Sequence, residues 1–294
     1  MTGELFAIIA PVFVIAGVGL AWKRLGMPFD TETITGVTTR IGTPALILST
    51  LARLEVTAAA FSEMVIASVC AFVFVAIVGG IALRLCRLPL AAFHTPLMAS
   101  NAGNMGLPLC LFAFGQEGLT LAIAFFALSA VYQFTIGIAV ASGDLSLRPV
   151  LRQPVIYAVL IGVVMILTGT HLPPFLDNTL RLLGGIPIPL MLVALGVSLA
   201  SLHLGTLRDS AIVALLRLSI GLAAGLTVAF LLGLEGAARG VLIVQCAMPV
   251  AVFNYLFASI YNRQPEVVAG SILISTIISF VTLPGLLLLA LGHF

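Results

Sequence analysis

Long apolar segments, separated by short polar or turn-rich breaks, run through the whole 294-residue chain. A bilayer core of roughly 30 Å is crossed by about 20 helical residues, and most of these segments have about that length. A chain that spans lipid must form helices or a closed barrel, and barrel strands would be shorter and would alternate in polarity. The sequence therefore predicts an all-α polytopic membrane protein. The ten predicted transmembrane helices cover residues 4–22, 33–52, 61–84, 92–114, 119–142, 153–170, 178–201, 209–233, 237–259 and 266–292.

Composition supports a single membrane-embedded unit. Hydrophobic residues make up 61% of the chain and charged residues 8%, the mean hydropathy is +1.23, and no stretch is polar enough for a second, soluble domain. No G-x-x-x-x-G-K-[ST] motif occurs, which argues against ATP-driven transport and leaves secondary or facilitated transport. No nucleophile, base and orienting group gather at one predicted place, so we do not expect an enzyme. We expect no cofactor, bound metal or nucleic-acid partner, and we expect the lipid bilayer as the surroundings.

Basic residues are distributed unevenly between the two sides of the predicted membrane. Eight follow predicted helices 1, 3, 5, 7 and 9, whereas three lie on the opposite side. Because cytoplasmic loops are enriched in Lys and Arg, the larger set is predicted to lie in the cytoplasm. Both termini would then be periplasmic, in a bacterial inner membrane. The larger set is Lys23, Arg24, Arg84, Arg87, Arg148, Arg152, Arg208 and Arg263, and the smaller set is Arg53, Arg181 and Arg239.

The two halves of the chain show a weak internal repeat at a shift of 145 residues. This register lays Pro44 on Pro189 and superimposes each of the first five predicted helices on one of the last five without a gap. An odd number of helices in each half means that the second half enters the membrane from the opposite side, which is the inverted repeat of many secondary transporters. The predicted domains are therefore residues 1–145, with helices 1 to 5, and residues 146–294, with helices 6 to 10.

Predicted helices 4 and 9 carry interruptions at matched positions. Helix 4 contains "SNAGNMGLPL" at residues 100–109, and the same register places it on "QCAMPVAVFN" at residues 245–254. Proline removes a backbone donor and clashes with the preceding turn, while Gly and Asn tolerate a broken backbone. Such breaks are too costly against lipid, so we expect them to meet inside the protein, where half-helix ends point N–H groups at a ligand. A simple kink in each helix is the alternative.

Four stretches carry a resemblance to a known family. "IGTPALILSTLA" in helix 2, "SNAGNMGLPL" in helix 4, "GIPIPLMLVALGVSLA" in helix 7 and "QCAMPVAVFNYLFASIY" in helix 9 resemble the auxin efflux carrier family, whose bacterial branch includes malonate and dicarboxylate permeases. The resemblance implies five plus five inverted helices. Helices 1, 2, 6 and 7 would form a scaffold, and helices 3–5 and 8–10 a transport domain in which broken helices 4 and 9 cross. This fold is similar to that of bile-acid sodium symporters and sodium/proton antiporters. The long hydrophilic loop of plant auxin carriers is missing, so auxin itself is not implied.

Charged residues at mid-membrane depth distinguish these related carriers. No carboxylate lies at mid-depth in a predicted helix, whereas sodium/proton antiporters need one to exchange a proton for a cation. Arg217, in "ALLRLSIG", lies about 12 Å into helix 8 and suits a substrate carboxylate. Snorkelling or pairing with a loop acid is the alternative for this arginine. A cationic group together with half-helix N-terminal ends favours an organic anion over a cation.

The predicted binding site lies at the two breaks. Asn101, Asn104 and Asn254 would bind the substrate carboxylate together with freed backbone N–H groups. Arg217 would add positive charge. Gln245, at the start of the second break, would bind substrate or bond to a neighbouring helix. Further predicted site residues are Gly103, Met105, Gly106, Pro108 and Pro249 at the breaks, Tyr132 and Gln133 in helix 5, and Pro44 and Pro189, which alternatively only kink helices 2 and 7.

Together these features predict an alternating-access carrier of small organic anions, such as mono- or dicarboxylates. Sodium-coupled, proton-coupled and uncoupled carriers all fit the sequence. Two alternatives remain: a sodium-coupled symporter of larger amphipathic anions, and a membrane receptor or scaffold that transports nothing. The sequence is compatible with a homodimer formed through the scaffold, and it leaves the anion and the direction of transport open.

Overall fold

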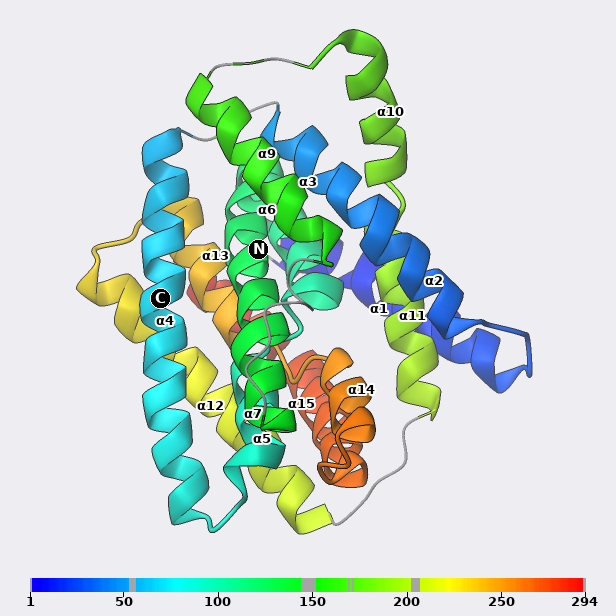
Figure 1. The fold of residues 1–294 in the computed structure, drawn as a ribbon, viewed down its shortest axis with the longest axis vertical. Helices are drawn as coiled ribbons and strands as arrows, with labels where there is room; N and C mark the ends of the chain where they lie inside the picture. Colours follow the sequence, from blue (N-terminus) through cyan, green and yellow to red (C-terminus); the bar gives the residue numbers. More distant parts are fainter. Residues whose placement is uncertain are drawn as a thin grey trace.

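The computed structural model describes residues 2–52, 57–143, 152–168, 170, 172–201 and 207–292, and these residues form helices joined by short connections (Figure 1). Within this part of the chain, the one extended pairing is an isolated bridge between Ser100 and Val250. The predicted domain boundary at residues 145 and 146, together with Arg53 and Arg148, lies outside the described residues. The elements are α1 Thr2–Arg24, α2 Thr31–Val37, η1 Thr38–Gly42, α3 Thr43–Leu51, α4 Ala58–Leu85, α5 Leu90–Met98, η2 Ala102–Gly106, α6 Leu107–Tyr132, η3 Gln133–Gly137, α7 Ile138–Ser142, α9 Pro154–Thr168, α10 Pro174–Gly184, α11 Pro187–Ser201, α12 Leu207–Leu231, α13 Gly236–Ala247, α14 Phe253–Ile260 and α15 Pro265–Ala290, where η marks a π-helix.

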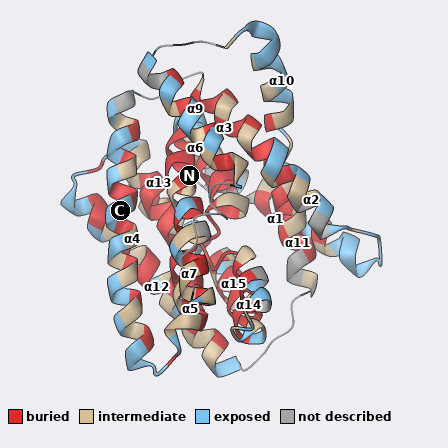
Figure 2. Cartoon of the chain, in the orientation of Figure 1, coloured by how far each residue is buried: buried red, intermediate tan, exposed pale blue. Residues whose placement is uncertain are grey.

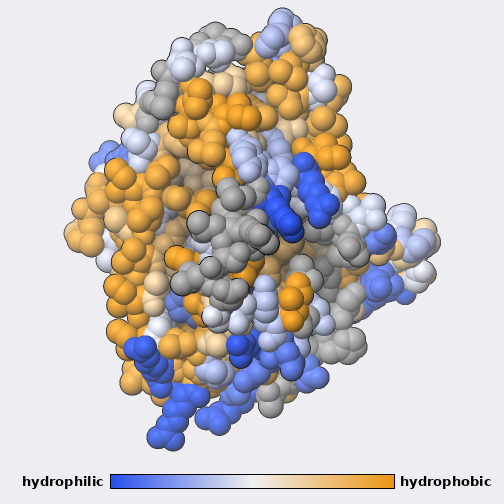
Figure 3. Space-filling model, in the orientation of Figure 1, coloured by the Kyte–Doolittle hydropathy of each residue, from blue (hydrophilic) through white to orange (hydrophobic). Residues whose placement is uncertain are grey.

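Five helical stretches among the described residues are long and apolar enough to cross a bilayer. One of them joins two predicted helices, and Gly115 marks the joint with a φ of 66°, a left-handed conformation that glycine adopts at little cost. The surface seen in Figure 3 is largely apolar, with hydrophilic atoms at its lower end and in smaller groups right of centre and at the right edge. Length and composition are those of a multi-pass membrane protein, as the sequence predicted. The five stretches are Ala59–Leu85, Ala102–Ser142, Pro174–Val197, Leu207–Leu231 and Pro265–Ala290.

The helices pack as two groups (Figure 1). In the α1 group, α1 runs along α11, while α3 packs against both α9 and α10, and α2 and η1 lead into α3. In the α4 group, α12 packs against α4, α13 and α15, and α6 packs against α4 and α13. Most of the largest fully buried side chains, such as Phe93, Met105 and Phe125, belong to the α4 group. The buried residues lie between the helices, and exposed residues face outward (Figure 2). The α4 group also contains α5, η2, η3, α7 and α14.

Small residues bring α1 and α11 into close contact. A β-carbon added to Gly19 would lie 2.0 Å from the carbonyl oxygen of Val193, and one added to Gly196 would lie 1.9 Å from that of Ala16. Each helix thus presents a glycine to the backbone of the other, which is a common way for membrane helices to approach closely. The two glycines therefore allow the close packing of α1 against α11.

The apolar stretch Pro174–Val197 is divided into two helices at residues 185 and 186, which corrects the single helix predicted over residues 178–201. α10 begins at Pro174 and ends at Gly184, and α11 begins at Pro187. Proline suits the first turn of a helix because the N–H groups there have no intrahelical partner, so Pro187 favours a new start rather than a kink. The two helices pack against different helices: α10 packs against α3, and α11 packs against α1.

Candidate functional site

The first break lies between α5 and η2. Ala99 adopts an extended conformation (φ −84°, ψ 96°), which ends α5. The helix resumes at Ala102 as the π-helix η2 and continues into α6, where Pro108 occupies the first turn. Pro108 therefore lies where the π-helix passes into the α-helix, and not at the start of the second half-helix. Short π-helical turns are frequent at functional sites, and this one follows the break directly.

The second break lies between α13 and α14. Met248 is extended (φ −62°, ψ 147°), as expected for a residue before proline, because the proline ring disfavours a helical predecessor. Pro249 therefore ends α13, and the helix resumes at Phe253. The local sequence thus causes both breaks, but different residue types are responsible in the two.

The two breaks lie side by side and pair as a short antiparallel bridge, which we call the crossing. The Asn101 N–H donates to the Pro249 carbonyl at 2.8 Å, and the Ala251 N–H donates to the Ala99 carbonyl at 3.1 Å. The side-chain amide of Asn254 also donates to the Ala99 carbonyl, at 3.2 Å and from 155 residues away in the chain. The structure thus brings Asn101, Pro249 and Asn254 of the predicted site to one place.

Hydrogen-bond donors without a partner gather at the start of η2. The backbone N–H groups of Ala102, Gly103 and Asn104 make no hydrogen bond to another described residue. The buried side-chain Nδ2 of Asn101 also has no partner among the described residues. Buried polar groups are nearly always paired, and a helix N-terminal end carries partial positive charge. This end of η2 is therefore suited to an anionic ligand.

Gln245 adds a second polar side chain from the opposite break. It is fully buried near the end of α13, and neither Oε1 nor Nε2 has a partner among the described residues. A β-carbon added to Gly106 would lie 2.2 Å from the Gln245 Oε1, so this amide lies directly against the backbone of η2. Ser100 Oγ and Asn254 Oδ1 are also buried, and within the described residues they too lack a partner. Both breaks therefore contribute unpaired polar atoms to the crossing.

Arg217 reaches the crossing from α12 and is only 2% exposed. Its Nε donates to the Met248 carbonyl at 3.2 Å, and its Nη1 and Nη2 donate to the carbonyls of Leu97 and Cys246. These carbonyls lie at the C-terminal ends of α5 and α13, where helical partners are lacking. The sequence assigned this guanidinium to a substrate carboxylate, with snorkelling or a loop acid as alternatives. In the structure it binds the backbone of the crossing and does not snorkel.

The remaining predicted residues of helices 4 and 5 differ in their surroundings. Met105 is fully buried, whereas Gly103 and Asn104 are half-buried. Tyr132 is buried, with its hydroxyl 2.9 Å from Nδ1 of His94 on α5. Gln133 is half-buried at the start of η3, and its Nε2 finds no hydrogen-bond partner in the described part of the chain.

The two predicted prolines of the α1 group lie on separate helices. Pro44 is half-buried in the first turn of α3, and Pro189 is exposed in the first turn of α11. Neither interrupts the helix that contains it. Because α11 packs against η2, the α1 group meets the first break along this helix.

Sequence reasoning undervalued two of the unpaired side chains. Ser100 was not among the predicted site residues. Gln245 was predicted either to bind substrate or to form a hydrogen bond to a neighbouring helix. The internal repeat holds a signal for both, because the shift of 145 residues places Ser100 on Gln245. A polar residue at the start of each matched break indicates a role at the crossing.

Comparison with known proteins identifies the family. A family model described as "Membrane transport protein" matches residues 138–287, which is about half of the chain. The chain belongs to this membrane transport protein family. An uncharacterized transporter of Methanothermobacter thermautotrophicus is 28% identical in an alignment that covers 93% of this chain and 94% of the relative. An uncharacterized transporter of Methanocaldococcus jannaschii is 28% identical over 198 residues, or 63% of this chain and 64% of the relative.

A plant relative bears out the resemblance described above. Auxin efflux carrier component 8 of Arabidopsis thaliana is 28% identical over 143 residues, which cover 46% of this chain and 39% of the relative. The chain therefore shares its family with carriers rather than with enzymes. The archaeal relatives are named only as transporters, so the substrate has to be argued from the site.

Proposed function

We propose that this protein is a secondary carrier that moves small organic anions, such as mono- or dicarboxylates, across the bacterial inner membrane by alternating access. The observation that carries the proposal is the cluster of unpaired donors at the start of η2. Four donors at the start of η2 would serve a bound carboxylate: the N–H groups of Ala102, Gly103 and Asn104, and the amide nitrogen of Asn101. The amide nitrogen of Gln245, which lies against Gly106 at the other end of η2, would add a fifth. Hydrogen bonds to a charged acceptor are shorter and stronger than neutral ones.

Charge at the crossing supports an anion rather than a cation. Among the described residues, Arg217 is the one charged side chain that hydrogen-bonds to the crossing. The half-helix dipole of η2 adds partial positive charge at the site itself. The oxygens of Gln245 and Asn254 would accept a hydrogen bond from a hydroxyl or protonated carboxyl group elsewhere on the substrate.

The arrangement of the helices supports alternating access. In the proposal, the chain forms ten membrane-spanning helices as a five plus five inverted repeat, with residues 1–145 and 146–294 as its halves. The α1 group is the scaffold and the α4 group is the transport domain. Because η2 contacts α11, the site lies beside the junction of the two groups, and their relative movement would open it to each side in turn.

Several finer features belong to the same proposal. Pro44 and Pro189 would shape the scaffold wall, and Tyr132 and Gln133 would line the transport domain side. Both termini would be periplasmic, and a homodimer would form through the scaffold. Coupling to sodium, to protons or to neither is a question that the transport assay addresses.

Uptake into proteoliposomes tests the proposal. Labelled malonate, malate and an aromatic carboxylate would be offered to the wild type and to Asn104→Ala, with and without sodium and pH gradients. Asn178→Ala is the matched control, because Asn178 is exposed on α10, outside the α4 group. In the proposal the side-chain amide of Asn104 also donates to the bound carboxylate, and Asn104→Ala removes this donor while keeping the backbone N–H. We therefore expect saturable uptake of at least one anion, reduced about 10-fold in Asn104→Ala and unchanged in the control.

Two results would count against the carrier. No flux of any anion under any gradient would favour a receptor or scaffold. Uptake that needs sodium and prefers the aromatic anion would favour a symporter of larger amphipathic anions. Equal uptake by wild type and Asn104→Ala would remove Asn104 from the site.

A further inference from the structure

Arg217 is a buried charge that the proposed binding of an anion does not use directly. It is 2% exposed, and none of the described carboxylates forms an ion pair with it. Withdrawing a charge from water without a counter-charge is expensive, and a charged residue inside a membrane protein is a candidate for a specific role. The groups that hydrogen-bond to Arg217 therefore indicate the role of its charge.

Those partners are the C-terminal ends of two half-helices that meet at the crossing. The guanidinium donates to Leu97 at the end of α5 and to Cys246 and Met248 at the end of α13. The last carbonyls of a helix lack intrahelical partners and carry partial negative charge. Two such ends at one point repel each other, and the three donors of Arg217 satisfy and neutralise both at once.

The surrounding helices are shaped to hold the guanidinium there. Gly221 lies one turn after Arg217 on α12, and a β-carbon at Gly221 would lie 2.9 Å from Nη2 and 2.2 Å from the Cys246 oxygen. A further turn along, a β-carbon at Gly225 would lie 3.0 Å from the Cα of Ile243. The row Arg217, Gly221, Gly225 therefore lets α13 approach α12 closely enough for its last carbonyls to reach the arginine.

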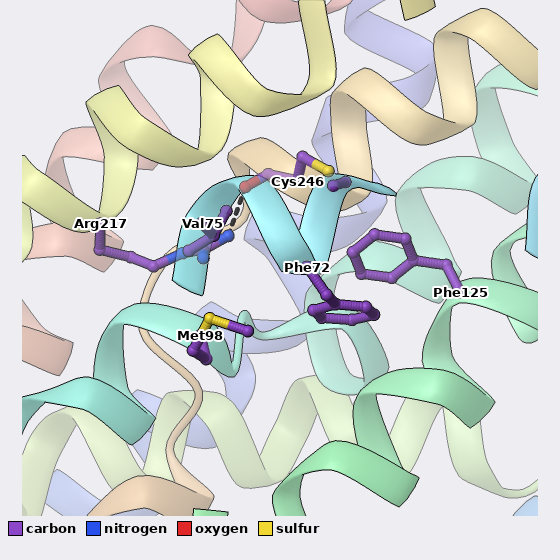
Figure 4. Close-up of a pocket in the computed structure, with 7 residues that line it drawn as sticks. Phe72, Val75, Met98, Phe125, Arg217 and Cys246 are labelled. Carbon is purple, nitrogen blue, oxygen red and sulfur yellow. Dashed lines mark hydrogen bonds between the residues drawn. The ribbon is translucent and has the colours of Figure 1, made fainter. Parts of the chain in front are cut away.

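The space beside the guanidinium excludes a substrate. A cavity of about 10 Å³ lies between Arg217, Cys246, Phe72, Met98 and Phe125 (Figure 4). A volume of this size holds at most one water molecule. Figure 4 shows the arginine pointing toward the Cys246 carbonyl, with both aromatic rings on the far side of the cavity.

We propose that Arg217 is the resident cation of the crossing: it joins the ends of α5 and α13 and takes the place that a bound monovalent metal ion would otherwise fill. Converging carbonyl oxygens are the ligands with which broken membrane helices and ion filters coordinate sodium and potassium. With the guanidinium in place, this position needs no metal ion. Without it, three unpaired carbonyls surround a space that a small cation can enter.

Thermal unfolding of the purified protein tests this inference without any transport assay. Wild type, Arg217→Ala and Arg217→Lys would be heated in choline chloride, sodium chloride and potassium chloride, and in choline chloride with low-millimolar guanidinium. Arg208→Ala is the matched control, because Arg208 is exposed on the same helix. We expect the Tm of wild type and control to be independent of the cation.

The variants are expected to respond differently from the wild type. In choline, Arg217→Ala should unfold about 10 °C below wild type, and sodium, potassium or guanidinium should restore part of the loss with a saturable dose response. Arg217→Lys, with a point charge in place of the fork, should fall between the two and show no cation response. If Arg217→Ala does not fold in choline, its recovery in folded form after extraction in guanidinium or sodium replaces the Tm as the readout.

Three outcomes would overturn the inference. They are a wild type stabilised by sodium as strongly as the alanine variant, an alanine variant as stable as wild type in choline, and a destabilised alanine variant that no small cation rescues. These experiments measure stability alone. Their result is therefore independent of whether the protein takes up an anion.

Discussion

The two breaks match in the internal repeat but use their backbone groups differently. In the second break, the Val250 N–H donates to Ser275 Oγ at 3.1 Å and the Ala251 N–H donates to the Ala99 carbonyl at 3.1 Å. In the first break, three consecutive N–H groups at the start of η2 have no partner among the described residues. Residues 247–251 are all buried, whereas Gly103 and Asn104 are half-buried.

This difference shows that an inverted pair of breaks does not have to form two equal halves of a site. The second break uses the N–H groups of Val250 and Ala251 to bind α15 and the first break. The first break uses the Asn101 N–H in the crossing but leaves three consecutive N–H groups without a partner among the described residues, at an end where the helix dipole favours an anion. Substitutions in the first break should therefore affect ligand binding, and those in the second should affect stability.

The largest effect is expected from Asn101→Ala. Its Nδ2 has no partner in the described part of the chain, so its loss should remove a bond to the bound anion without leaving another group unpaired. Such a bond contributes about 1.5–3 kcal/mol, so the initial uptake rate at low substrate should fall roughly 10- to 100-fold. The Tm should stay near that of wild type, and Asn178→Ala provides the baseline for both measurements. A large loss of Tm with normal uptake would show that the first break stabilises the protein and does not bind the anion.

A smaller effect, on stability, is expected from Ser275→Ala. This change leaves the buried Val250 N–H without its acceptor, which costs about 1–3 kcal/mol and should lower the Tm by several degrees. Ser219→Ala is the control, because Ser219 is exposed and bonds only to carbonyls of its own helix. Protein that remains folded should keep the KM of wild type. A changed KM with an unchanged Tm would place the second break in the binding site.

The smallest effect on stability is expected from Gln245→Met. The side chains have similar length, and the change removes two buried polar atoms that have no partner among the described residues. Replacing an unsatisfied polar group by an apolar one is close to neutral or stabilising, so the Tm should stay the same or rise slightly. Uptake should nevertheless fall, because the amide donor is lost. A marked drop in Tm would show that Gln245 is bound to the protein instead.

Local sequence was sufficient to locate the breaks. Pro249 forces its predecessor Met248 out of the helix, and the Gly and Asn residues of "SNAGNMGLPL" weaken the other helix at the matching place. The same reasoning missed the separation of α10 from α11. The sequence alone does not distinguish a proline within a helix from a proline that starts a helix. The difference becomes clear only from the other helices against which each segment packs.

The partners of Arg217 could not be read from the sequence. The arginine bonds to main-chain carbonyls, which every residue has, so no partner side chain marks the contact. The sequence does contain a weaker signal. Glycine at four and eight residues after Arg217 predicts a close helix on that face, and this spacing would have indicated that the charge is enclosed rather than free.

The bridge between the breaks also sets the order in which the protein can be completed during its synthesis. The Asn101 N–H and the Ala99 carbonyl find their partners only on Pro249 and Ala251, in the second half of the chain. At about 5–20 residues per second, roughly 8–30 s of translation separate the two segments. For that interval the first half must keep these backbone groups in contact with water, the insertion machinery or other temporary partners. The crossing is therefore assembled after insertion has begun, when the second half arrives to close it.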